Sequence, residues 1–127
     1  MFEKLELTRM AQALAAHSGA RMAVIARNVA HADTPGYKAQ DLPVFAKVFA
    51  AEGGQMRATR PGHLVAAASQ GALVPEQAPG RESPNGNTVS LEGEMVKSVE
   101  ARQSHEMALA IYRATSDVVR ASLGRSR

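Results

Sequence analysis

The sequence contains no cysteine and no tryptophan, and its 127 residues include only three phenylalanines and two tyrosines. The lack of cysteine excludes a disulfide scaffold, a thiolate metal site and a cysteine nucleophile. No apolar run approaches the ~20 residues that span a bilayer. The first residues also lack the basic-then-apolar order of a cleaved secretory signal. We therefore expect neither direct insertion into a membrane nor removal of a leader.

Large apolar side chains are also scarce. Hydrophobic residues make up 45% of the chain, but 24 of them are alanine. Because large apolar side chains supply most of the energy of a buried core, this composition leaves little material for one. We expect a single small domain whose core is thin.

Positive charge is in excess but is spread along the chain. The net charge is +3 and the pI is about 9.7. Arg120, Arg125 and Arg127 form the one basic cluster, and basic residues at a helix C-terminus complement the helix dipole. A DNA-binding protein usually gathers its positive charge on one face or arm. We therefore expect no nucleic-acid partner, with a small basic helical DNA-binding or adaptor protein as the alternative function.

Proline divides the chain into three parts, residues 1–31, 32–88 and 89–127. All six prolines lie in the middle part, which predicts little regular structure there. Within it we expect a short helix after Asp41, and short strands or extended loops at 62–65 and 72–74.

The two outer parts predict long helices, from Thr8 to Ala30 and from Ser90 to Leu123, with Ser90 as N-cap and Gly124 as the C-terminal stop. The sequence thus predicts a mainly α fold. Long N- and C-terminal helices pair as an α-helical coiled coil, and the short middle segment is irregular or contains some β structure.

Each predicted helix carries one row of apolar residues. The rows repeat every 11 residues rather than every seven, which predicts a straight or slightly right-handed pairing. Both rows are rich in alanine and polar residues, so the pair would bury little area. Either neighbouring subunits cover the rows, or a helical hairpin packs on the middle segment. The residues expected to pack the helices are Leu14, Met22, Ile25, Val29, Val96, Val99, Met107, Ile111 and Val118.

Patterns for catalysis and metal binding are missing. The histidines are not spaced as ligands on one helix face. His105 and Glu106 begin the zinc-protease helix motif, but position 109 is leucine. His31 and Asp33 come closest to a general-base pair, yet at a helix end both residue types are common for local hydrogen bonding. We therefore expect no enzyme, no cofactor and no metal ion.

The most distinctive string is residues 26–39. Pro35 and Gly36 suit the second and third positions of a type II turn, because proline presets φ and glycine accepts a positive φ. Asn28 suits a place near the helix end, and Asp33 or Thr34 is expected to cap freed backbone groups. Taken alone, these residues predict a helix stop followed by a chain reversal.

The same string carries a resemblance to a known family. Ala26, Asn28, Ala30, Thr34, Pro35, Gly36 and Tyr37 resemble the signature that follows the first helix of bacterial flagellar rod and hook proteins. Residues 85–95 are similar to the run that opens the C-terminal helix of the family's proximal rod member, and residues 59–64 agree more weakly. One departure is His31, where the family commonly has asparagine.

The resemblance implies a structural protein rather than an enzyme. Such proteins are exported by the flagellar type III apparatus and polymerise in the periplasmic rod of the basal body. Their partners are copies of themselves, other rod proteins, and the export gate or base-ring adaptor. The family's turn motif would comprise Asn28, Asp33, Thr34, Pro35, Gly36 and Tyr37.

A second short segment has two interpretations. Residues 45–49 resemble a hydrophobic motif read by the export gate, with Phe45 and Phe49 as its aromatic residues. An ordinary short helix explains the same residues equally well.

Overall fold

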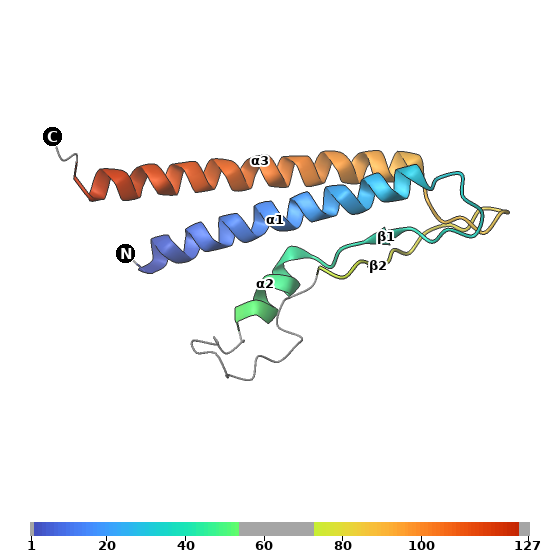
Figure 1. Ribbon diagram of the computed structural model, residues 1–127, viewed down its shortest axis with the longest axis horizontal. Helices are drawn as coiled ribbons and strands as arrows, with labels where there is room; N and C mark the ends of the chain where they lie inside the picture. Colours follow the sequence, from blue (N-terminus) through green and yellow to red (C-terminus); the bar gives the residue numbers. More distant parts are fainter. Residues whose placement is uncertain (1, 54–72, 125–127) are drawn as a thin grey trace, which may run out of the picture.

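The computed structural model describes residues 2–53 and 73–124. Its elements, in chain order, are α1 (Phe2–Ala30), β1 (Gln40–Asp41), α2 (Phe45–Gly53), β2 (Glu76–Gln77) and α3 (Leu91–Ser122). The long helices α1 and α3 run antiparallel and side by side, while β1, β2 and α2 lie along α1 on the side away from α3 (Figure 1). The predicted mainly α fold, with paired terminal helices and a short middle segment, is confirmed.

Local signals set the ends of the long helices. Ser90 caps α3, since its Oγ accepts a hydrogen bond from the Gly93 N–H at 3.3 Å. Gly124 follows the last turn with a φ of +75°, as expected of a C-terminal stop. α1 begins at Phe2 rather than at Thr8, because the residues between them are mostly good helix formers and include neither proline nor glycine.

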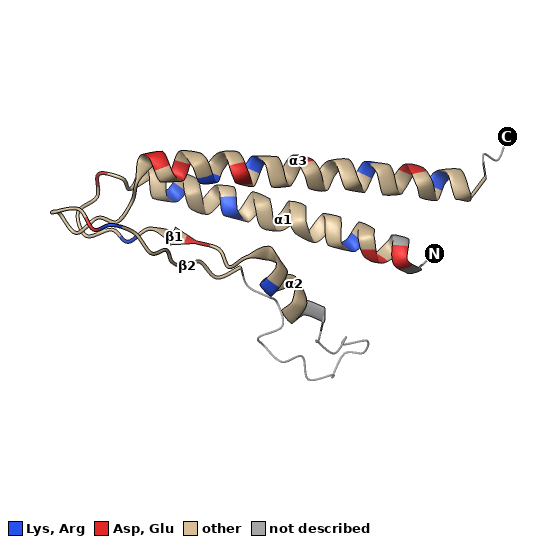
Figure 2. Cartoon of the chain, turned by 180° about the vertical axis from the view of Figure 1, so that it is seen from behind, with Lys and Arg blue, Asp and Glu red and all other residues tan. Residues whose placement is uncertain are grey.

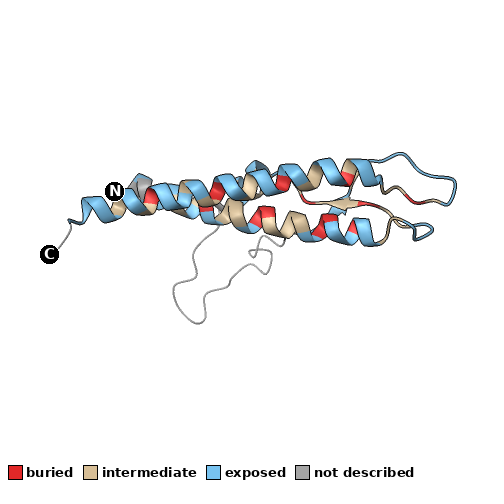
Figure 3. Ribbon diagram, turned by 90° about the horizontal axis from the view of Figure 1, so that it is seen from above, coloured by how far each residue is buried: buried red, intermediate tan, exposed pale blue. Residues whose placement is uncertain are grey.

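The face of α3 that meets α1 is made of small residues and one carboxylate. Glu94, Ala101, Ala108 and Thr115 are buried at seven-residue intervals, visible as evenly spaced buried turns in Figure 3. Residues seven apart lie on one helix face, and small side chains there let two backbones approach closely. The predicted 11-residue period is therefore wrong for the contact between α1 and α3.

α1 is buried on two adjoining faces, because α3 covers one and the middle segment the other. Ala11, Ser18 and Ile25 form one buried row at seven-residue intervals, and His17 and Val24 form a second. We call the first row, together with the buried row of α3, the seam. The helical hairpin packed on its middle segment, one of the two arrangements that periodicity left open, is present in the chain, and coverage by neighbouring subunits stays a prediction.

The middle segment contains the short helix α2, as predicted after Asp41, and a two-residue antiparallel ladder. In the ladder Gln40 pairs with Gln77, and Asp41 with Glu76. The extended segment expected at 62–65 lies outside the described residues. The described part of the other one, residues 73–74, is not a strand. In the described ranges no helix is long and apolar enough to cross a membrane.

Candidate functional site

The chain reversal after α1 has the predicted geometry. Gly36 adopts a φ of +73°, and the Tyr37 N–H donates to the Thr34 carbonyl at 3.3 Å. The ring of Tyr37 stacks on His31 with centroids 4.6 Å apart. Pro35 and Gly36 are exposed, so the turn lies at the surface, where its own backbone, this stacking and bonds from residues 85–88 hold it.

Asn28 has a larger role than a residue at a helix end. It is fully buried, and both ends of its amide are bonded. Its Nδ2 donates to the Gln40 carbonyl at 2.7 Å and to Glu94 Oε2 at 2.9 Å. Its Oδ1 accepts from the Gln40 N–H at 3.1 Å and from the Tyr37 hydroxyl at 3.3 Å. One amide therefore joins α1, β1, α3 and the turn, and it satisfies its full hydrogen-bonding capacity.

A second buried amide, that of Asn87, holds the turn that follows α1. Its Nδ2 donates to the carbonyls of His31, Ala32 and Thr34 at 2.7–2.9 Å. Its Oδ1 accepts from the Val89 N–H at 2.7 Å, two residues before α3 begins. From the sequence we expected Asp33 or Thr34 to bond these backbone groups. That expectation is wrong. Both are exposed, and an amide more than 50 residues away in the sequence bonds the carbonyls that follow the helix instead.

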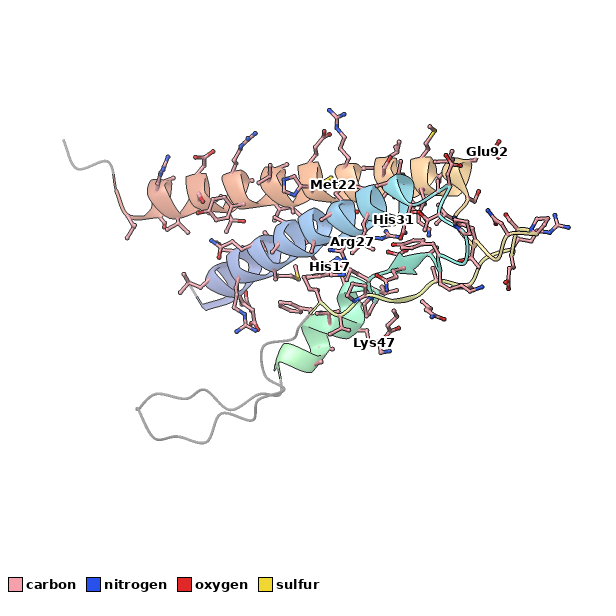
Figure 4. All side chains as sticks on the ribbon, turned by 45° about the vertical axis from the view of Figure 1, so that its right-hand side comes forward. His17, Met22, Arg27, His31, Lys47 and Glu92 are labelled. Atoms are coloured by element: carbon pink, nitrogen blue, oxygen red, sulfur yellow. The ribbon has the colours of Figure 1, made fainter. Side chains whose placement is uncertain are left out.

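These bonds bring the two motif strings together. The Gly36 N–H donates to the Asn85 carbonyl at 3.0 Å, and the Thr88 N–H donates to the Tyr37 carbonyl at 3.1 Å. Thr88 Oγ1 accepts from the Ala39 N–H at 2.8 Å. We call the set Asn28, Tyr37, Asn87, Thr88 and Glu94 the motif junction. It lies at the end of the helix pair marked by His31 and Glu92 in Figure 4.

A charged network that the sequence did not reveal extends the junction along the seam. Arg21 binds Asp41 with two hydrogen bonds, Nε to Oδ1 at 2.9 Å and Nη2 to Oδ2 at 3.0 Å. Lys97 Nζ lies 2.9 Å from Glu94 and 3.8 Å from Asp41. The network therefore connects α1, β1 and α3.

Burial and pairing oppose each other at Asp41. Desolvation alone would raise its pKa, but hydrogen bonds from Arg21 and the Leu42 N–H and the charges of Arg21 and Lys97 outweigh it, so the pKa is lowered. The hydrogen bond to Asp41 likewise raises the pKa of Arg21 against the effect of its own desolvation. Both side chains are therefore held ionised, as an ion pair that fastens β1 to α1.

The two phenylalanines of the short helix face α1. The ring centroids of Phe45 and His17 are 5.6 Å apart, and those of Phe45 and Phe49 are 5.4 Å apart. Arg9 lies over the Phe49 ring at 5.7 Å. His17 Nε2 is 2.8 Å from the Pro43 carbonyl. In the folded chain both rings are half-buried, and the segment packs as an ordinary amphipathic helix would.

The residues expected to pack the helices are placed unevenly. In α1, Ile25 is buried, Leu14 and Met22 are half-buried, and Val29 is exposed. In α3, Ile111 is half-buried, but Val96, Val99, Met107 and Val118 are 60%, 66%, 53% and 48% exposed. We call these four exposed apolar residues of α3 the outer row. Their expected contact with neighbouring subunits stays a prediction.

Four polar side chains around one groove are already bonded to the chain. The groove has a volume of about 300 Å³ and lies where α1, the start of α2 and α3 meet. Of its lining residues, Arg21 and Asp41 bind each other, Ser18 Oγ donates to the Leu14 carbonyl, and His17 faces Pro43. Ser104 also lines the groove, but the other four polar side chains are occupied by the chain, so we assign no ligand.

The side chains of His31 and Asp33 do not bond to each other in the described part of the chain. His31 Nδ1 lies 2.9 Å from the Arg27 carbonyl of its own helix, and Asp33 is exposed. Across residues 2–53 and 73–124, no three acidic or histidine side chains gather to hold a metal ion.

Comparison with known proteins adds no family or named relative. No protein-family model matches the chain, and no curated protein matches it.

Proposed function

We propose that the chain is a structural, non-catalytic subunit of the bacterial flagellar axial family. Within that family its motif strings most resemble those of FlgB, the proximal rod protein of the basal body. Two features support the proposal. The strings at 26–37 and 85–95 carry the resemblance, and their residues bond to each other in one buried junction. A shared signature is expected where two distant segments must meet.

The observation that carries the proposal is the outer row of α3. A helix that packs inside its own chain usually turns its large apolar residues inward. Here the seam uses Ala101 and Ala108, which are 1% and 0% exposed, while Val99 and Met107 are 66% and 53% exposed. Apolar rows of this kind mark surfaces that another protein covers. Neighbouring rod subunits, either copies of this chain or other rod proteins, would cover it.

The proposal includes the route to the periplasm. The chain would leave the cytoplasm unfolded through the flagellar type III apparatus, and a sequence without cysteine forms no disulfide on the way. Phe45 and Phe49 pack against α1 side chains, so the export gate would read them before α2 docks. The base of the export gate or its ring adaptor would be the other partner.

The test is mass spectrometry of intact basal bodies purified from the bacterium that encodes the chain. We expect the chain in the rod fraction at a few copies per basal body. Its absence, while other rod proteins are plentiful, would overturn the proposal.

A paired variant sharpens this test. Val99→Ser with Met107→Ser should leave the helical circular dichroism unchanged and abolish swimming, because both side chains are exposed in the folded chain. The control is Arg102→Ala, which breaks an exposed pair with Glu106 and should leave swimming intact.

No observation favours the alternative of a basic DNA-binding or adaptor protein. In Figure 2 residues of both signs alternate along α1 and α3 rather than gathering on one face. Arg125 and Arg127, part of the basic cluster, lie outside the described residues. Binding of DNA at low salt, lost steeply as salt rises, would support that alternative instead.

A further inference from the structure

The seam alone does not specify one alignment of α1 and α3. Its buried residues recur every seven positions on both helices, and most are small: Ala11 and Ser18 on α1, Ala101, Ala108 and Thr115 on α3. Sliding one helix by seven residues therefore places small residues opposite small residues again. The connection between the helices is long, and its two ends are bonded to each other around the motif junction, where the Gly36 N–H donates to the Asn85 carbonyl and the Thr88 N–H donates to the Tyr37 carbonyl.

Two of the polar contacts across the seam are also weakly selective. Arg21 and Glu100 lie 3.8 Å apart, with side chains 26% and 58% exposed, and exposed pairs of this kind add little stability. His105 Nδ1 lies 3.2 Å from the Ala15 carbonyl, and a helix presents a carbonyl on every turn. A displaced register would offer His105 another backbone carbonyl, while Arg21 would face Met107 and lose only this exposed pair.

The amides of the motif junction behave differently. Asn28 reaches Glu94 across the seam while it also holds both backbone groups of Gln40. After a displacement of seven residues, Asn28 would face Ala101, the next seam position of α3. Asn28 and Glu94 would then each lose a buried partner, and burying unpaired polar groups is unfavourable.

Asn87 acts at the adjoining end of the pair. It bonds three carbonyls around the end of α1 and the backbone two residues before α3. The start of α3 is therefore held beside the end of α1, at one place.

We propose that Asn28 and Asn87 together fix the register of α1 against α3. Single buried polar residues set register in the same way in coiled coils, where they exclude alignments that the apolar seam allows. A fixed register also determines the surface of the helix pair, because it places the outer row of α3 at one position along α1. A displaced pair would present those side chains about 10 Å away along the helix axis, seven residues at ~1.5 Å each. The inference holds whether or not the chain is a rod subunit.

The absence of cysteine makes the register directly measurable. Ala23→Cys on α1 and Arg113→Cys on α3 replace exposed residues and allow one nitroxide label on each helix. Pulsed electron double resonance then gives the distance between the labels. In the otherwise unchanged chain we expect a single distance.

The test removes the amides in steps. In one variant Asn28→Leu is combined with Glu94→Leu, so that the buried carboxylate is removed together with its amide partner, while the half-buried Gln40 backbone and Tyr37 hydroxyl lose their bonds to Asn28. A second variant carries Asn87→Ala, and a third carries all three substitutions. Each of the first two should keep the original distance. The third should stay helical and show a second distance that reflects a displacement of about 10 Å.

Two results would overturn the inference. One is a single, unchanged distance in the folded triple variant, because something other than the amides would then fix the register. The other is loss of helical circular dichroism in that variant, because the seam would then be unable to hold the pair without them. Ser18→Ala is the control: it removes a buried hydroxyl of the seam that bonds within its own helix, and it should leave the distance unchanged.

Discussion

Replacing Asn28 by alanine should be one of the most destabilising single substitutions in the chain. The change removes four hydrogen bonds and leaves their partners behind. Glu94 is 2% exposed, and a lost hydrogen bond to a buried carboxylate costs roughly 2 kcal/mol. Gln40 and Tyr37 are half-buried, so water replaces part of the bonds lost there, at a cost of about 1 kcal/mol. We expect a loss of about 3 kcal/mol from a total stability on the order of 5–15 kcal/mol.

Urea unfolding followed by circular dichroism measures this loss. Ser18→Ala is the matched control, since Ser18 is also 2% exposed in the seam, but its hydroxyl bonds only the Leu14 carbonyl, four residues earlier in α1. That substitution should cost less than about 1 kcal/mol. If Asn28→Ala cost no more than Ser18→Ala, the argument that one amide holds four segments together would be wrong.

Three further predictions concern the turn, the seam and the charged network. At Gly36 a Cβ would meet open space, so the positive φ of +73° is the main penalty; Gly36→Ala should cost about 1 kcal/mol and Gly36→Val about 2–3 kcal/mol in urea unfolding, and equal costs would contradict this. Ala108→Leu should cost about 1–3 kcal/mol by overpacking the seam, whereas Ala110→Leu on the exposed side of α3 should change little; similar melting temperatures for the two would place the seam elsewhere. Burial opposes ionisation of Asp41, but its hydrogen bonds and neighbouring cations lower its pKa below the ordinary 3.8, so the folded chain binds a proton less readily than the unfolded chain. The stability it contributes is present at neutral pH and is lost as the pH falls from about 5 to 2, and Asp41→Asn should flatten that part of the pH profile; an unchanged slope would refute the role of the pair.

The elements that depend on near neighbours in the sequence were predicted from it. The N-cap at Ser90, the stop at Gly124 and the turn at Gly36 each follow from residues within a few positions. The positive φ of Gly36 and the closing hydrogen bond of the turn agree with the prediction. Such features can be predicted from the local sequence alone, because they do not depend on contacts with distant segments.

The packing of α3 was not predicted, because the larger apolar side chains were expected to face inward. The rule fails when two helices meet through small residues, since alanine then marks the contact and the valines are left outside. The heptad spacing of Glu94, Ala101, Ala108 and Thr115 is present in the sequence. It is masked by a second row that is more hydrophobic.

The motif junction could not be derived from local signals either. Asn87 bonds carbonyls 53 to 56 residues away. The residue pattern of a single segment does not predict a hydrogen-bond partner at that distance. The available clue was indirect: two separate strings, 26–37 and 85–95, resemble the same family. Each string contains one of the two buried amides.

Seam and outer row together divide the apolar residues of α3 between two tasks. The seam buries alanines, and transferring an alanine side chain from water contributes little free energy. Close backbone packing and polar hydrogen bonds therefore stabilise the helix pair more than a large apolar core does. The outer row keeps four larger side chains about half exposed or more. Burying the remaining exposure of each would add on the order of 1 kcal/mol, so covering the row would add several kcal/mol to a marginally stable fold. Under the proposed function, association would therefore add apolar burial that the seam does not supply, and the proposed register would determine which surface the chain presents to its neighbours.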